Sequence, residues 1–153
     1  MAADPQNFRN ALISTFARAV PHVQELGIVV DSLDERGALA HMPYRDEWLG
    51  DPSRGLIHTG LVTSFVDSIS GVAVFGKLAN FEPIATLDLR MDYLRPALRD
   101  KPLHGRAECY RVSSHIAFVR ASVWQDDEQQ PVAQSQSVFM RSSHSARRSR
   151  KAI

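Results

Sequence analysis

The apolar residues near the start of the chain recur at the spacing of an α-helix. Asp4 followed by Pro5 is typical of a helix start, with the aspartate as N-cap and the proline in the first turn. Four apolar residues then follow at intervals of four and share one stripe: Phe8, Leu12, Phe16 and Val20. The pattern predicts an N-terminal helix over about residues 5–20, ended by Pro21.

Short runs of apolar residues predict strands over much of the remaining chain. Residues 27–44 form two such runs around an Asp-Glu-Arg-Gly turn, which predicts a hairpin. After Pro83, apolar residues at the odd positions 87–93 alternate with polar residues that begin at Thr86, as in a half-buried strand. Three further candidate strands follow, over residues 104–112, 115–124 and 131–140.

Between the hairpin and these strands lies the least polar segment, residues 55–75. It holds eleven apolar residues, three glycines and a single acid, Asp67. As a helix it would be about 31 Å long, enough to cross a bilayer. However, His58, Asp67 and five hydroxyl residues would be unfavourable in lipid without partners. We therefore expect a core helix buried in protein, which begins near Thr59 or Gly60.

Asp67 lies on a stripe of small and hydroxyl residues when this segment is plotted as a helix. Residues three, four or seven positions away form the stripe: Gly60, Thr63, Ser64, Ser70 and Gly71. The other faces carry large apolar side chains. A buried charge is unfavourable unless it is paired, so such an acid often marks a functional site. The alternative is a structural acid hydrogen-bonded to serine or threonine.

The start of the same helix offers a second chemical group. The free backbone N–H groups near Thr59 and the positive end of the helix dipole make an oxyanion site. Asp67, two turns further on, has the chemistry of a base or nucleophile for a carbonyl group bound there. His58 is either a general base or a structural cap of the helix.

Composition is that of one soluble domain. The chain has 153 residues, of which 44% are apolar and 23% charged. Helix, hairpin, long helix and strand meander, in that order, predict an α+β fold with an antiparallel sheet, as a single domain over residues 1–140. Cys109 is the only cysteine, in a strand-like run, and we expect an inert, partly buried thiol. Without disulfides or an apparent signal peptide, we expect a cytoplasmic protein.

Charge is distributed unevenly along the chain. Residues 141–153 carry five basic side chains and no acid, whereas residues 1–140 hold 13 basic and 17 acidic ones, a net charge of −4. We expect residues 141–153 to be a disordered tail. A solvated chain end is the simpler interpretation, and an anchor for nucleic acid or an anionic surface is the alternative. We therefore expect neither a nucleic acid nor a membrane as partner.

Several familiar catalytic patterns are missing from the sequence. It contains no G-x-S-x-G, no P-loop, no G-x-G-x-x-G and no H-E-x-x-H, and no His, Cys and acid cluster has the spacing of metal ligands. We expect no metal and no cofactor.

The residues around Asp67 resemble the hotdog-fold acyl-CoA thioesterases of the phenylacetate-degradation (PaaI-like) type and the related 4-hydroxybenzoyl-CoA thioesterases. The family pattern is G-x-x-H-G-G with an acid eight residues after the first glycine of the pair. This sequence has Gly55, His58, Thr59 and Gly60, with Asp67 eight residues after Thr59. The strand that ends in Tyr-Leu-Arg-Pro-Ala and the run Ser-Ser-His-Ile-Ala-Phe-Val-Arg-Ala-Ser-Val-Trp also look like family strands. The likeness covers roughly residues 25–140.

The resemblance implies a long central helix wrapped by a curved antiparallel sheet, and hydrolysis of acyl-CoA thioesters. It implies a homodimer with a composite active site, often paired again into a tetramer; CoA is then part of the substrate.

By this resemblance Asp67 is the catalytic carboxylate, as nucleophile or as general base, and the Thr59 N–H, with Gly60 beside it, polarises the thioester carbonyl. Thr86 positions water from the facing strand. The loop that meets the nucleotide of CoA consists of Ser113, Ser114 and His115. Arg95 suits a phosphate contact because of its charge.

Two departures from the family pattern bear on activity. Thr59 replaces the first glycine of the pair, which keeps the backbone N–H but adds a β-branched side chain. Pro52 stands where many relatives carry an asparagine, so that side-chain donor is missing. A non-enzymatic acyl-CoA-binding protein is therefore one alternative, and an enoyl-thioester hydratase is another, although the hydratase pattern of Asp with His five residues later does not occur in this loop.

Overall fold

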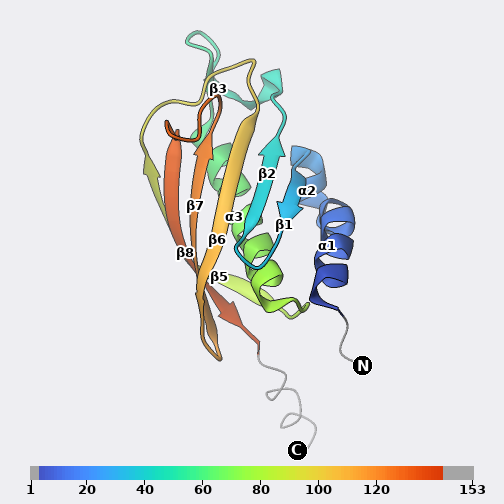
Figure 1. The fold of residues 1–153 in the computed structure, drawn as a ribbon. Helices are drawn as coiled ribbons and strands as arrows, with labels where there is room; N and C mark the ends of the chain where they lie inside the picture. Colours follow the sequence, from blue (N-terminus) through green and yellow to red (C-terminus); the bar gives the residue numbers. More distant parts are fainter. Residues whose placement is uncertain (1–3, 143–153) are drawn as a thin grey trace, which may run out of the picture.

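A long helix, α3 (Thr59–Leu78), lies against one face of a six-stranded antiparallel sheet (Figure 1). The computed structural model describes residues 4–142. The sheet has the order β1 (Val29–Leu33), β2 (Ala38–Met42), β6 (Leu103–Val112), β7 (Ile116–Trp124), β8 (Ala133–Arg141) and β5 (Ile84–Tyr93). A short 3-10 helix, η1 (Asp46–Trp48), leads into a two-stranded ribbon of β3 (Leu49–Asp51) and β4 (Leu56–Ile57) before α3. The α+β fold, the hairpin and the long central helix are confirmed.

The N-terminal helix ends where the sequence predicts, and a second helix follows that the sequence analysis missed. In α1 (Pro5–Ala19), Asp4 caps the first turn by accepting a hydrogen bond from the Gln6 N–H at 3.0 Å. Val20 is extended, and Pro21 then begins α2 (Pro21–Leu26). Proline ends one helix because it lacks an N–H, and the same property suits it to the first turn of the next helix.

Helix α3 is buried by the sheet along its most apolar face. Phe65 and Ile69 have no exposed surface and pack on Gly105 of β6, where an added Cβ would come within 2.7 Å of both side chains. Glycine at this position therefore lets the helix approach the sheet closely. By length and composition α3 could span a membrane, but 61% of its most apolar window is buried within the protein. The apolar character of the segment is accounted for by this packing.

Strand β5 forms one edge of the sheet, and an irregularity near its start changes which side chains face α3. Its pairing with β8 shifts between Thr86 and Asp88, so Leu87 bulges out of the ladder and is 56% exposed. Strict alternation would place Thr86 and Leu89 on opposite faces. Because the bulge adds a residue, Thr86 and the half-buried Leu89 both face the helix side.

The C-terminal end of β8 is fastened by a buried ion pair. Arg141 donates to the Glu82 carboxylate at 2.7 Å, and Glu82 is only 4% exposed. Arg141 also donates to the Ser113 carbonyl at 2.6 Å. Arg141, which the charge pattern assigned to the tail, is thus the last residue of the sheet. Ser142 also belongs to the described residues and donates its N–H to the Pro83 carbonyl at 3.1 Å, so the expectation of a disordered tail from residue 141 is wrong for these two residues. Residues 143–153 of the expected tail lie outside the described residues.

Candidate active site

The start of α3 presents one free backbone N–H. His58 is the N-cap, and its Nδ1 accepts a hydrogen bond from the Gly60 N–H at 3.0 Å. The histidine is therefore a cap, and Gly60 has already used its donor. The Thr59 N–H has no hydrogen-bond partner in residues 4–142, and it points out of the first turn, as helix geometry requires. Of the two donors expected at this end, only Thr59 is available to a ligand.

Asp67 is held by the neighbouring edge strand. Thr86 Oγ1 donates to Asp67 Oδ1 at 2.8 Å, which links β5 to α3. The other carboxylate oxygen, Oδ2, has no hydrogen-bond partner in the described part of the chain. Asp67 is half-buried in the single chain. One oxygen is therefore oriented by Thr86, and the other is not engaged by the described part of the chain.

Tyr93 is a residue at this site that the sequence analysis missed. Its hydroxyl group donates to the Thr59 carbonyl at 3.2 Å and lies 2.5 Å from Thr63 Oγ1. The side chain is 45% exposed, so it forms an outer wall beside the start of α3. Tyr93 lies two residues after Met91 on the helix-facing side of β5, and this spacing was a usable signal. Its hydrogen bonds fix the first turn of the helix against the strand.

Within one chain, Thr59 and Asp67 are too far apart to act on the same atom. They are eight residues apart in α3, which separates their backbones by about 12 Å along the helix axis. A carbonyl group needs its oxyanion donor and its attacking group each about 3 Å away. Within one chain, the acid therefore does not reach a carbonyl group bound at the start of its own helix.

A hollow of about 370 Å³ opens beside the start of α3. Its lining is mainly apolar and comes from β4, α3 and the segment after β5: Leu56, Ile57, Thr59, Val62, Tyr93, Leu94, Arg95, Pro96, Ala97 and Val132. Arg95 is exposed at this hollow and donates from Nη1 to Gln130 Oε1 at 2.8 Å. A cation in the lining of a mainly apolar hollow suits a ligand that has an apolar chain and a phosphate group.

The loop of Ser113, Ser114 and His115 lies at the opposite end of the sheet from Thr59 (Figure 1). Its side chains are exposed; Ser113 closes the turn by accepting from the Ile116 N–H at 3.1 Å, and Ser114 Oγ is 2.7 Å from His115 Nδ1. One chain therefore does not bring this loop to Thr59.

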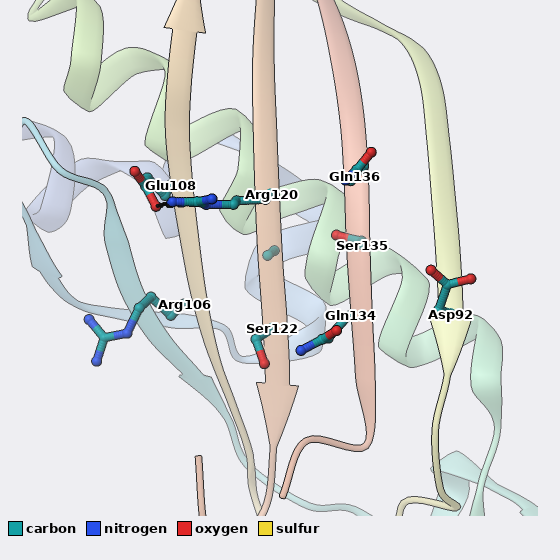
Figure 2. A pocket seen from close by; sticks show the side chains of 9 residues that line it. Asp92, Arg106, Glu108, Arg120, Ser122, Gln134, Ser135 and Gln136 are labelled. Carbon is teal, nitrogen blue, oxygen red and sulfur yellow. Dashed lines mark hydrogen bonds and ion pairs between the residues drawn. The ribbon is translucent and has the colours of Figure 1, made fainter. Parts of the chain in front are cut away.

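A second hollow, of about 310 Å³, lies on the sheet face that points away from α3. Figure 2 shows Glu108 and Arg120 side by side on it, with Ser122, Gln134 and Gln136 nearby. Arg120 Nε donates to Glu108 at 2.9 Å. Because the sheet separates this hollow from Asp67, it is not the predicted site. No group of three or more His, Cys, Asp or Glu able to hold a metal occurs in residues 4–142.

Comparison with known proteins places the chain in a family. The model of the thioesterase superfamily matches residues 54–132, which include the start of α3, Asp67 and Thr86. A crystal structure of a Pseudomonas aeruginosa protein is 38% identical, with a TM-score of 0.78 over 88% of this chain and 99% of that chain. The medium/long-chain acyl-CoA thioesterase YigI of Escherichia coli K12 is 23% identical over 138 residues, which are 82% of this chain and 88% of that protein.

The fold itself is also shared with a more distant structure. The E. coli PaaI protein of the phenylacetic acid degradation operon is 17% identical, with a TM-score of 0.80 over 92% of this chain and 97% of that one. The long helix against the antiparallel sheet is thus the hotdog arrangement that the sequence resemblance implied. These matches support a hydrolase that acts on thioesters in general. The chain belongs to the thioesterase superfamily.

Proposed function

We propose that the protein hydrolyses acyl-CoA thioesters at a site shared between two copies of the chain. The observation that carries the proposal is the Asp67 carboxylate, which has one oxygen held by Thr86 at 2.8 Å and the other unpartnered within the described residues. A half-buried carboxylate fixed in this way is suited to attack or to deprotonate a bound reactant.

The shared site follows from the separation within α3. If Thr59 and Asp67 cannot reach one carbonyl from the same chain, then Asp67 of one copy has to act with Thr59 of the other. Strand β5 supplies a route, because its outer edge is unpaired in residues 4–142 and carries the exposed Leu87. Antiparallel pairing of two β5 edges places the start of one strand beside the end of the other. We therefore propose a homodimer, which can pair again as a dimer of dimers.

In this arrangement the chemistry divides between the two chains. The Thr59 N–H donates to the thioester oxygen and stabilises the negative charge that develops there. Asp67 of the other copy either takes a proton from a water that adds to the carbonyl carbon, or adds to that carbon itself to give an anhydride that water then cleaves. In both routes the carbon–sulfur bond breaks, the thiolate of CoA leaves and takes up the proton, and the free acid remains. Rapid quenching followed by mass spectrometry distinguishes the routes, because only the second attaches the acyl group to the protein.

The remaining residues suit the CoA portion of the substrate. The hollow beside Thr59 has a mainly apolar lining, which suits the pantetheine arm, and Arg95 in that lining offers a charge to the phosphates. The same antiparallel pairing of β5 edges carries the loop of Ser113, Ser114 and His115 from the far end of one chain toward the start of α3 in the other. A nucleotide contact from that loop is therefore compatible with a dimer.

The test is steady-state hydrolysis of acyl-CoA esters of different chain length by the parent and by Asp67→Asn. We expect the amide to lower kcat/KM by about 100-fold or more, because base or nucleophilic catalysis is lost. Glu35→Gln, which changes an exposed acid in the turn between β1 and β2, away from α3 and from the β5 edge, is the control and should keep the parent rate. Equal rates for Asp67→Asn and the parent would contradict the proposal. Binding without hydrolysis by the parent would indicate an acyl-CoA-binding protein, and hydration of a 2-enoyl-CoA would indicate a hydratase.

A further inference from the structure

Three serine hydroxyl groups are buried beside the candidate site without any hydrogen-bond partner. They belong to Ser70 of α3 and to Ser135 and Ser137 of β8, whose residues are 0%, 5% and 2% exposed. Among the residues that the structure describes, no other buried side-chain nitrogen or oxygen lacks a partner. An unpaired buried hydroxyl destabilises a fold, because it loses its hydrogen bonds to water without replacement. Three of them in one region therefore call for an explanation.

The three hydroxyls lie on the side of α3 that carries Asp67. Ser135 and Ser137 are alternate residues of β8, so both point to the inner face of the sheet, and they pair in register with Met91 and Leu89 of β5. Figure 2 shows Ser135 on β8 between Gln134 and Gln136. Leu89 and Met91 are only partly buried. The two residues of β5 that lie beside Ser135 and Ser137 are thus accessible in part from outside the core.

Ser70 approaches the same region from the helix. It lies less than one turn after Asp67, and Asp67 contacts Thr86 of β5. At the other end of β5, Tyr93 contacts Thr63, one turn before Asp67. Because β5 follows this side of α3 and β8 is its neighbour in the sheet, the buried Ser70 faces the β8 and β5 part of the sheet.

We propose that these three hydroxyls form the polar end of the acyl site and select an acyl group that carries a neutral oxygen atom, a hydroxyl or a carbonyl. This proposal rests on the proposed thioesterase function, since it names the class of acyl group that the site takes. A hydroxyl group both donates and accepts, so the three serines can pair with either kind of oxygen. None of the three is charged, and a carboxylate buried among them would lack a cation. A purely aliphatic chain would leave all three unpaired.

The acyl group reaches this position from the reacting carbonyl. A thioester held against Asp67 directs its acyl chain along α3, and displacement of Leu89 or Met91 opens the way toward Ser135 and Ser137. Sites that hydrogen-bond a substrate hydroxyl discriminate strongly against the analogue that lacks it, because the buried polar groups of the site are then left unpaired. The preference for oxygen should therefore be large and should depend on where along the chain the oxygen stands.

The experiment measures binding by calorimetry to the Asp67→Asn variant, which separates recognition from hydrolysis. The probes are hexanoyl-CoA and its isomers with a hydroxyl group at carbon 3, 4, 5 or 6. We expect at least one isomer to bind at least tenfold more tightly than hexanoyl-CoA. Replacement of Ser135 and Ser137 by alanine in the same background should reduce that ratio to within twofold, whereas Ser122→Ala, on the outer face of β7, should leave it unchanged.

The melting temperature is a second measurement, and it distinguishes a role of the serines in ligand binding from a role in stabilising the fold. If the hydroxyls serve only a ligand, Ser135→Ala with Ser137→Ala should melt at the parent temperature or above, because an unpaired polar group has been removed. A lower melting temperature with an unchanged binding ratio would overturn the proposal and assign the serines to an internal water. Equal binding of all isomers and hexanoyl-CoA would overturn it as well. Failure of the parent to hydrolyse any thioester would contradict the proposed function alone, because the binding ratio does not depend on turnover.

Discussion

Thr86 Oγ1 and Asp67 Oδ1 lie 2.8 Å apart, and this hydrogen bond joins the edge strand of the sheet to the central helix. It restricts the rotation of the carboxylate and leaves Oδ2 without a hydrogen-bond partner among the described residues. The bond forms between groups separated by 19 residues in sequence, so it depends on the docking of β5 beside α3. A carboxylate held by a neighbouring hydroxyl is oriented before any substrate arrives.

Removal of the Thr86 hydroxyl should impair catalysis without unfolding the protein. We expect Thr86→Val to lower kcat/KM by about 10- to 100-fold, which corresponds to the roughly 1.5–3 kcal/mol typical of a hydrogen bond to a charged group. Thr86→Ser keeps the hydroxyl and should stay within about threefold of the parent. Because Thr86 is exposed, melting temperatures should be nearly equal. A Val variant as active as the Ser variant would show that the bond does not serve the reaction.

The position of Thr86 illustrates where reasoning from the sequence succeeds and where it fails. The period of two in residues 86–94 correctly predicted a strand, because a half-buried strand needs alternation. The same alternation placed Thr86 and Leu89 on opposite faces, whereas the bulge at Leu87 turns both toward α3. A bulge depends on how one strand pairs with its neighbour, and the sequence of β5 alone does not predict it. Only the family resemblance pointed to Thr86.

Other parts of the site differ in the same way. The cap at His58 and the start of α3 were predictable, because capping is local and depends on a few adjacent residues. The exposure of Asp67 was not, because composition shows a stripe of small residues without showing what covers it. The ion pair of Arg141 with Glu82 could not be predicted either, because the two residues are far apart in sequence and Arg141 lies beside other basic residues.

Disruption of the Glu82–Arg141 pair should destabilise the fold strongly. Glu82→Gln leaves the guanidinium of Arg141 without its counter-charge in a site where the carboxylate partner is 4% exposed. We expect the free energy of unfolding in urea to fall by about 3 kcal/mol, as for other broken buried pairs. Glu128→Gln, which breaks the exposed pair with Arg106, is the control and should change stability by less than about 1 kcal/mol. Equal effects of the two variants would contradict the structural role of Glu82.

Cys109 should be unreactive in the native protein. The residue is 2% exposed, and desolvation by burial raises the pKa of its thiol to about 11. At pH 8 the native protein should therefore resist alkylation by iodoacetamide, whereas protein unfolded in urea should react fully, as measured by mass spectrometry. In the unfolded chain the thiol ionises near its ordinary pKa of 9.0. Stability should thus decline as the pH rises from about 9 toward 11, since only the unfolded state gains the favourable ionisation. Rapid labelling of the folded protein would contradict this account of the thiol.

The proposed role of the Thr59 backbone N–H can be tested with one substitution. Thr59 is the first residue of α3, and His58 before it has φ −64° and ψ 128°, a conformation that a following proline accepts. Thr59→Pro therefore removes the proposed oxyanion donor and still suits the first helical position. We expect it to lower kcat by about 100-fold or more, as loss of an oxyanion donor does. Thr59→Ala keeps the N–H and should retain most activity. Equal kcat for the Pro and Ala variants would show that this N–H does not serve the reaction.

The most direct test of the central claim is a mixture of two inactive proteins. Thr59→Pro and Asp67→Asn chains, co-expressed with different tags, give mixed dimers that can be purified and assayed with an acyl-CoA ester. If Asp67 of one chain acts with Thr59 of the other, each purified mixed dimer contains one intact site of two and should show about half of the parent activity. If each chain holds a complete site, every site in the mixture lacks one group. Activity no higher than that of either variant alone would then contradict the account.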